Sequence, residues 1–237
     1  MTQAPAPVCL LTRPAAQAAR FAARVEAELS LPSLISPLLR IAPVQASIDW
    51  TTCAGAILTS QHAASRLAAL GAPRALPVYA VGTRTAEIAS EHGFAAEALG
   101  GDVEAFLPAL LARLAGAVAP GALLHLRGVQ SRGDLAARLT ESGVPCEEAV
   151  VYQQLEEALT AEASAYLAGG EPVIAPVFSP RSGQLLARAA PFRAPVHVVA
   201  MSANVAASFD GVALAGLCVA DLPTEEAMIA AMARISR

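Results

Sequence analysis

Six short stretches of the sequence gather the side chains that could bind an anionic ligand. Each follows an apolar run, precedes an Ala-rich stretch and is built mostly from Ser, Thr, Gly, Asn or Arg. Hydroxyls, guanidinium groups and the free amides of a helix start all bind carboxylates and phosphates. The residues that we single out are Thr12, Arg13, Thr59, Ser60, Gly82, Thr83, Thr85, Arg127, Gly128, Ser179, Arg181, Ser182, Ser202 and Asn204.

Each stretch also has a purely structural interpretation. Ser and Thr are ordinary N-caps of helices, and Gly is an ordinary turn residue. For any single stretch we prefer that interpretation. Six stretches of the same kind, several of them with Arg, instead favour a surface that binds a ligand with several carboxylates.

Tyr152 is the remaining candidate for chemistry. It ends the apolar run at 147–152, directly before the polar segment at 153–158 that would link two domains, so its hydroxyl is expected to reach a ligand. The alternative is an aromatic ring that packs against one domain, because Tyr commonly combines a buried ring with a solvated hydroxyl. The residues alone leave both interpretations open.

Other kinds of chemistry find no support in the sequence. All 16 basic residues are Arg, which excludes a Schiff base and a phosphate-binding lysine. The segment at 81–86 lacks the glycine spacing of a dinucleotide-binding motif. The histidines at 62, 92, 125 and 197 lack the short spacing of a metal site, so no metal is predicted, and His125 and His197 are interpreted as buried core residues.

The six stretches need elements that bring them together. Apolar runs typical of buried strands alternate with Ala-rich helical patterns, as in α/β folds with parallel sheets. In such sheets, ligands bind beyond the carboxyl ends of the strands, where helix N-termini present free amides. Strands are predicted at 8–12, 56–60, 77–82, 122–128, 147–152, 173–179, 195–200 and 214–220, and helices at 15–29, 63–70, 85–92, 103–114, 132–142, 182–190 and 224–235.

The sequence also repeats itself. The segments at 56–70, 77–90 and 103–114 resemble those at 176–190, 195–208 and 224–235, each about 120 residues later. A weaker pair joins 10–25 to 123–139. Chance similarity in an Ala-rich chain is the alternative. We prefer duplication, which predicts two similar α/β domains.

Composition narrows the class of protein. Hydrophobic residues make up 55% of the chain and charged residues 15%, which is typical of a globular protein. A formal net charge of −4 argues against nucleic-acid binding. The sequence shows no membrane-spanning run, no basic leader and no closely spaced cysteines. It therefore predicts a cytoplasmic protein with reduced thiols and no membrane partner.

The order of the motifs resembles that of the uroporphyrinogen-III synthase family, and the likeness runs nearly end to end. The motifs are TRP at 12–14, TS at 59–60, AVGTRTA at 80–86, LLHLRG at 123–128, AVVYQ at 149–153 and VFSPRSG at 177–183. The chain departs from the family at 201–208, MSANVAAS, where a Gly followed by two Thr is usual. Arg181 is a further variation.

The resemblance implies an α/β fold of two similar Rossmann-like or flavodoxin-like lobes with parallel sheets, joined by a two-stranded linker, with a cleft between them. Lobe 1 would combine residues 1–36 and 155–237, so that the first strand and helix pack with the C-terminal part. Lobe 2 would hold residues 40–148. The linker strands would lie at 36–39 and 149–154.

The resemblance also implies a reaction. A lyase of this family cyclises hydroxymethylbilane, a linear tetrapyrrole with eight carboxylates, to uroporphyrinogen III in heme biosynthesis, with loss of water and inversion of ring D through a spiro intermediate. No redox step occurs, so no cofactor is expected. The six stretches would bind the acetate and propionate groups, and Tyr152 matches the family's tyrosine proposed to assist departure of water. A monomer is expected. The alternative is a two-lobed protein that binds an organic acid without catalysis.

Overall fold

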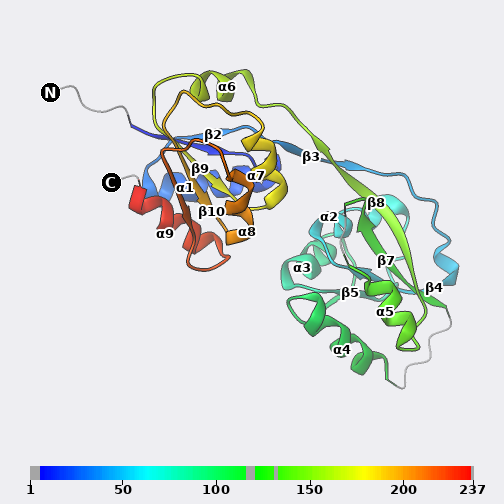
Figure 1. Cartoon of the computed structure of the whole chain (residues 1–237). Coiled ribbons are helices and arrows are strands. Elements are labelled where there is room, and N and C mark those ends of the chain that lie inside the picture. Colours follow the sequence, from blue (N-terminus) through cyan, green and yellow to red (C-terminus); the bar gives the residue numbers. More distant parts are fainter. Residues whose placement is uncertain (1–5, 116–120, 131–132, 236–237) are drawn as a thin grey trace. The chain divides into compact units, whose positions relative to one another are not determined.

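The chain folds into two units, each built around its own sheet. The computed structural model describes residues 6–115, 121–130 and 133–235. One unit combines Met1–Arg40 with Leu155–Arg237, and the other holds Ile41–Gln154. Figure 1 shows helices packed on the faces of each sheet. The predicted class of two α/β lobes with parallel sheets is confirmed.

The first unit has a five-stranded parallel sheet in the order β11-β10-β9-β1-β2. β1 (Val8–Leu11) lies between β9 (Val173–Val177) and β2 (Ser33–Ile35), so the N-terminal strand pairs with the C-terminal part of the chain, as the resemblance implies. The other elements are α1 (Ala15–Leu29), α6 (Ala161–Leu167), α7 (Pro180–Ala187), β10 (Val196–Ala200), α8 (Ala203–Ala206), a 3-10 turn at Ala207–Phe209, β11 (Gly216–Val219) and α9 (Glu225–Ile235).

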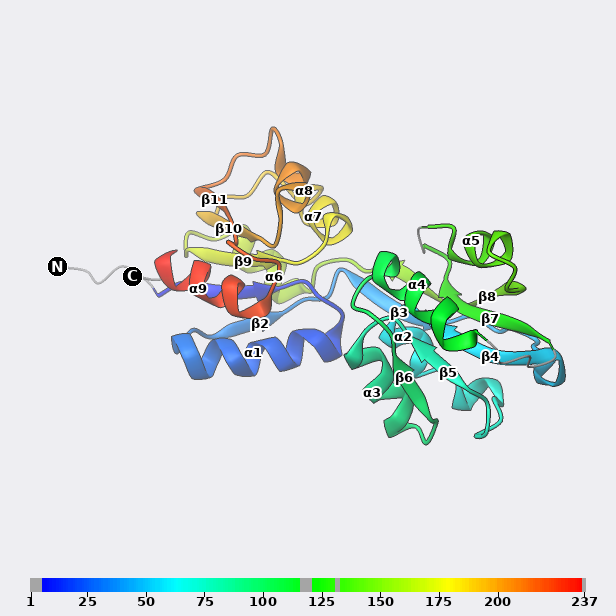
Figure 2. The same ribbon diagram turned by 90° about the horizontal axis from the view of Figure 1, so that it is seen from below.

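Helices cover both faces of this sheet, with α7 and α8 on one side and α1 on the other (Figure 2). One apolar cluster includes residues of α6, α7 and α8, and a second includes residues of α1 and α9. Every residue of β1 and β9 is buried. Their continuous apolar sequences follow from this, because a strand that is covered on both faces has no solvated side.

The second unit has a six-stranded sheet in the order β3-β8-β7-β4-β5-β6. Its pairs β4–β5, β4–β7, β5–β6 and β7–β8 are parallel. α2 and α3 pack on one face, and α4 and α5 pack on the other (Figure 2). The elements are β3 (Leu39–Pro43), a 3-10 turn at Trp50–Thr52, β4 (Cys53–Leu58), α2 (Gln61–Ala64), a 3-10 turn at Ala68–Leu70, β5 (Val78–Ala80), α3 (Thr83–Glu91), β6 (Ala96–Ala98), α4 (Val103–Leu114), β7 (Ala122–Gly128), α5 (Leu135–Glu141) and β8 (Cys146–Glu156).

The two sheets follow one plan. The order β11-β10-β9-β1-β2 in the first unit corresponds to β6-β5-β4-β7-β8 in the second. The helices that follow corresponding strands also correspond: α7 with α2, α8 with α3, α9 with α4 and α1 with α5. All four segment pairs that the sequence suggested fall on corresponding elements, so the structure supports duplication of a single α/β lobe.

The chain passes from one unit to the other within β3 and again within β8, which are neighbouring strands. The predicted linker at 36–39 ends at the first residue of β3, and the one at 149–154 lies inside β8. Within the described part of the chain, every helix falls short of the length and apolar character needed to span a bilayer.

Candidate functional site

The structure places the predicted site residues at or near the carboxyl ends of strands, except Tyr152. Tyr152 was expected to end its strand but lies inside β8, where it pairs with Gly128, the last residue of β7. Because the carboxyl ends of parallel strands meet at one edge of a sheet, each unit gathers its own set. The first carboxyl edge, which follows β1, β9 and β10, holds Thr12, Arg13, Ser179, Arg181, Ser182, Ser202 and Asn204. The second carboxyl edge, at β4, β5, β7 and β8, holds Thr59, Ser60, Gly82, Thr83, Thr85, Arg127, Gly128 and Tyr152.

Three serines at these edges are helix N-caps. The hydroxyl oxygens of Ser60, Ser179 and Ser202 accept hydrogen bonds from the backbone amides of His62, Ser182 and Val205. Ser179 also donates its hydroxyl hydrogen to the hydroxyl of the buried Ser182, 2.9 Å away. The structural interpretation therefore accounts for much of the hydrogen bonding of these serines.

Tyr152 and Gly128 form a single packing unit at the second carboxyl edge. They are register partners on β8 and β7, and a methyl group at Gly128 would lie 2.6 Å from two carbons of the Tyr152 ring. The ring of His62 packs edge-on to that of Tyr152, with centroids 5.6 Å apart. Burial lowers the pKa of His62, so this neighbour is neutral at pH 7. Only 8% of Tyr152 is exposed.

A chain of polar contacts runs across three strands of the same sheet. Thr59 Oγ1, after β4, lies 3.1 Å from Nε2 of His125 on β7. Nδ1 of His125 lies 3.3 Å from Oε1 of Glu148 on β8, and Oε2 of Glu148 lies 2.9 Å from Nε of Arg127. Burial is the main cause of the lowered pKa of His125; Glu148 opposes the shift and Arg127 reinforces it.

The sequence predicts a core histidine at 125 and an ordinary solvated carboxylate at 148. His125 is indeed buried, but it bonds directly to a predicted site residue. The strand register supplies the signal that was missed, since Ile57, His125 and Glu148 are aligned across β4, β7 and β8. Residues aligned in this way lie on one face of the sheet.

The start of α3 has no side-chain cap. Gly82 is the N-cap and carries no side chain that could cap the helix. Thr83 is exposed in the first turn, whereas Thr85 is buried. Arg84 is engaged with Glu87 and Glu91 on the outer surface of the helix. Backbone amides at such a helix start favour an anion.

At the first carboxyl edge, the Arg13 side chain contacts other residues of the same unit. Its guanidinium lies 3.9 Å from the centroid of the Phe178 ring and pairs with Glu225, in the first turn of α9. Only 17% of its side chain is exposed. Thr12 is 1% exposed, and its hydroxyl has no hydrogen-bond partner among the residues that the structure describes. Both residues are thus largely enclosed by neighbouring side chains.

Arg181 and Asn204 are the more accessible polar groups of the first edge. Arg181 Nη2 lies 3.6 Å from a carboxylate oxygen of Glu156, a carboxylate that Arg188 also contacts at 3.2 Å. Asn204 is exposed in the single turn of α8. Of the predicted residues on this edge, these two are best placed to meet a ligand from solvent.

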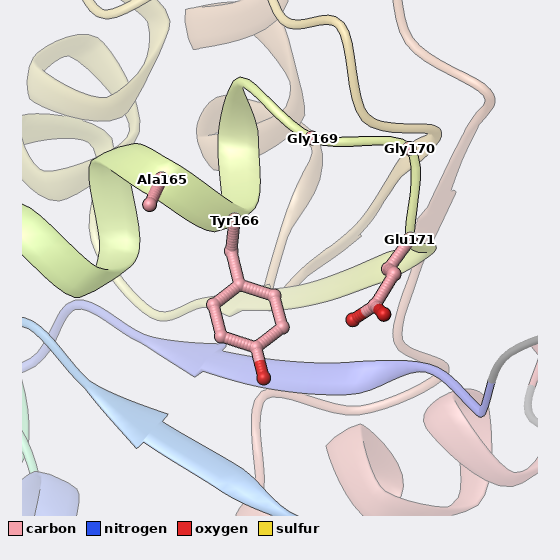
Figure 3. A pocket seen from close by; sticks show the side chains of 5 residues that line it. All are labelled: Ala165, Tyr166, Gly169, Gly170 and Glu171. Atoms are coloured by element: carbon pink, nitrogen blue, oxygen red, sulfur yellow. The ribbon is translucent and has the colours of Figure 1, made fainter.

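Two hollows within the units lie at the other ends of the strands. One, of about 310 Å³ in the first unit, is lined by Ala165, Tyr166, Gly169, Gly170 and Glu171, which precede β9 (Figure 3). The other, of about 390 Å³, is lined in part by Pro77 and Ala95, which precede β5 and β6. Neither contains a predicted site residue.

Metal and thiol chemistry gain no support from the side chains. Among the described residues, His, Cys, Asp and Glu form no group of three or more suited to a metal ion. The four cysteines are free. Burial raises the pKa of Cys9 to about 12 and that of Cys146 to about 11, which disfavours their nucleophilic thiolate forms.

Comparison with known proteins gives the family. The model of the uroporphyrinogen-III synthase HemD family matches residues 20–230. A crystal structure of uroporphyrinogen-III synthetase from Helicobacter pylori 26695 aligns with a TM-score of 0.69 at 19% identity, over 97% of this chain and 99% of that one, which shows a shared fold. A mutant uroporphyrinogen III synthase from the extremely thermophilic bacterium Thermus thermophilus aligns at 15% identity over 96% of this chain and 98% of that one, with a TM-score of 0.48. Curated protein sequences give no match. Because the family model spans most of the chain, this protein belongs to the uroporphyrinogen-III synthase HemD family.

Proposed function

We propose that this protein is a hydro-lyase that converts hydroxymethylbilane to uroporphyrinogen III with loss of water and inversion of ring D. The observation that carries the proposal is the family match over residues 20–230. The arrangement of donor groups at the strand ends is consistent with it. Nothing in the comparisons favours the alternative of an organic-acid binding protein without catalysis.

Binding of the substrate is mainly an electrostatic task. Hydroxymethylbilane carries eight carboxylates, and these need hydrogen-bond donors. We assign carboxylate binding to the open start of α3 at Gly82 and Thr83, and to Arg181 and Asn204 on the first edge, because these groups are the accessible ones. We assign Arg13 an indirect role, because its contacts with Phe178 and Glu225 position the end of β1 against α9.

The chemical step needs little help from the protein. As the hydroxymethyl oxygen leaves, it takes a proton and departs as water, and the resulting azafulvene is attacked by the substituted carbon of ring D. We assign the assisting hydroxyl to Tyr152, whose ring is fixed by Gly128 and His62. The spiro intermediate then fragments and recloses. No electrons enter or leave, so the reaction requires no cofactor.

Geometry matters more than chemical activation here, because free hydroxymethylbilane closes unaided to the type I isomer. An enzyme that holds the chain in the curl required for spiro closure converts an unguided reaction into an oriented one. Many carboxylate contacts share this work, so loss of a single contact is expected to have a moderate effect.

The test is the isomer composition of the product. Freshly prepared hydroxymethylbilane is incubated with the protein, the product is oxidised, and the type I and type III porphyrins are separated. We expect type III to dominate with the native protein and type I to dominate with heat-denatured protein. Type I alone, at the rate of the uncatalysed control, would refute the proposal. A monomeric state and a cytoplasmic location remain predictions.

A further inference from the structure

The contacts from Thr59 to Glu148 have a definite hydrogen-bond direction. Glu148 contacts both His125 Nδ1 and the guanidinium of Arg127. A carboxylate beside a guanidinium accepts hydrogen bonds and donates none. Nδ1 of His125 therefore carries a hydrogen and donates it to Glu148.

Nε2, the second ring nitrogen of His125, then carries no hydrogen at neutral pH. Burial lowers the pKa of His125 from the ordinary 6.5, so the imidazole holds a single hydrogen at pH 7, and that hydrogen is on Nδ1. Nε2 consequently accepts the hydroxyl hydrogen of Thr59, 3.1 Å away. Thr59 has no other hydrogen to donate through its side chain.

The other groups on the sheet face that carries His125 do not change the direction of the hydrogen bonds from Thr59 to Glu148. Phe106 of α4 and Leu135 of α5 cover the face with apolar side chains. Cys146 remains a thiol, since burial raises its pKa to about 11. The other charged residues on the adjoining elements are Glu147 and Glu156 of β8, Glu104 and Arg113 of α4, Arg138 and Glu141 of α5, and Asp134 at its N-cap. Glu104 pairs with Arg138, Arg113 with Glu97, and Glu156 with Arg188.

Thr59 therefore presents only lone pairs to a ligand. It is half-buried at the carboxyl end of β4, so part of the residue is exposed to a ligand. A substrate carboxylate also offers only lone pairs, whereas each pyrrole ring offers an N–H donor. We propose that Thr59, oriented by His125 and Glu148, accepts a hydrogen bond from a pyrrole N–H of the bilane and does not bind a carboxylate. This inference rests on the proposed function and reverses the role that the sequence suggested for Thr59.

The inference predicts how the effect of Thr59 on catalysis varies with pH. At pH 8, Thr59→Val is expected to lower kcat/KM for hydroxymethylbilane about two- to tenfold, mainly through KM, as loss of one neutral hydrogen bond would. As pH falls through the pKa of His125, which burial holds below 6.5, the ring becomes protonated and donates to Thr59. One of the two lone pairs of the Thr59 oxygen is then occupied and its hydroxyl hydrogen is free to donate, so Thr59 becomes a weaker acceptor for a pyrrole N–H. The ratio of kcat/KM between native protein and Thr59→Val should therefore shrink toward one at low pH.

Three controls sharpen the experiment. Thr59→Ser keeps the hydroxyl, so its kcat/KM should equal that of the native protein at every pH. Thr83→Val removes an exposed hydroxyl of the same edge that lies on a different element from His125, and its ratio should not vary with pH through that histidine. Nitrogen-15 spectra of the histidine rings, with His125 assigned by comparison with His125→Gln, should show hydrogen on Nδ1 and none on Nε2 at pH 8.

The outcomes separate this inference from the proposed function. A native-to-Thr59→Val ratio that grows as pH falls would mean that protonated His125 frees Thr59 to bind a carboxylate, and it would overturn the inference. A ratio of one at every pH, or a hydrogen on Nε2 at pH 8, would overturn it as well. Formation of the type III isomer by the native protein in any of these cases would leave the proposed function standing.

Discussion

The side chains that matter most here depend on partners far away in the sequence. Tyr152 and Gly128 were both identified from the sequence, but the sequence did not reveal that the ring occupies the space left by the missing Cβ. Arg13 is also identified from the sequence, but its partner Glu225 lies at the other end of the chain. Residue types can be predicted from a pattern, whereas partners depend on the fold.

Tyr152→Phe tests the assignment of the assisting hydroxyl. The phenylalanine ring keeps the packing against Gly128 and His62, so binding should be preserved. We expect kcat to fall about tenfold or more and KM to change by less than about twofold. This fall in kcat is small for the loss of a general acid, because the leaving group departs readily. Initial rates at saturating hydroxymethylbilane, corrected for unaided closure, measure this. An unchanged kcat would remove Tyr152 from the chemical step.

Gly128→Ala tests the packing beneath that tyrosine. The added methyl group would lie 2.6 Å from the Tyr152 ring, so the ring or the strand must move. We expect the free energy of unfolding to fall by about 1–3 kcal/mol, as in other overpacked sites. Gly101→Ala is the matched control, because nothing lies within 4 Å of a methyl group at Gly101. Equal urea midpoints for the two variants would contradict this account.

At the scale of elements, long and buried segments were predicted best. The helices at 15–29 and 103–114 and the strand at 122–128 match the structure residue for residue. The short strands β2 and β6 and the helices α6 and α8 were missed. β6, with the sequence Ala-Glu-Ala, has neither the β-branched residues nor the burial that mark a strand, and it forms because β5 pairs with it. Its register is set by the sheet and not by its own residues.

The place of β1 in its sheet predicts how fragments behave. β1 pairs with β2 on one side and β9 on the other, so residues 155–237 alone lack a central strand and α1. We expect this fragment to show no cooperative thermal transition by circular dichroism. Residues 41–154 retain most of their sheet and should unfold cooperatively. Cooperative unfolding of 155–237 by itself would contradict the strand order.

At the scale of the whole molecule, the internal repeat was the most informative sequence signal. Copies about 120 residues apart predicted two similar units, and the two sheets share one strand order. The repeat does not predict that β1 joins the sheet of the C-terminal part. Only the family resemblance implied this placement. Because the two lobes are equivalent, the sequence pattern of β1 fits the sheet of either lobe. Only the tertiary contacts of β1 decide which sheet it joins.

We propose that accessible donors at the carboxyl edges bind the bilane and thereby direct its closure. The most direct measurement is KM for hydroxymethylbilane and the type III fraction at low substrate, in one variant from each edge. Thr83→Val should raise KM about two- to tenfold, and Arg181→Gln should raise it about tenfold or more because a charged donor is lost. Both should increase the type I fraction, since unbound bilane closes unaided. Native KM and native isomer ratios in both variants would contradict the account.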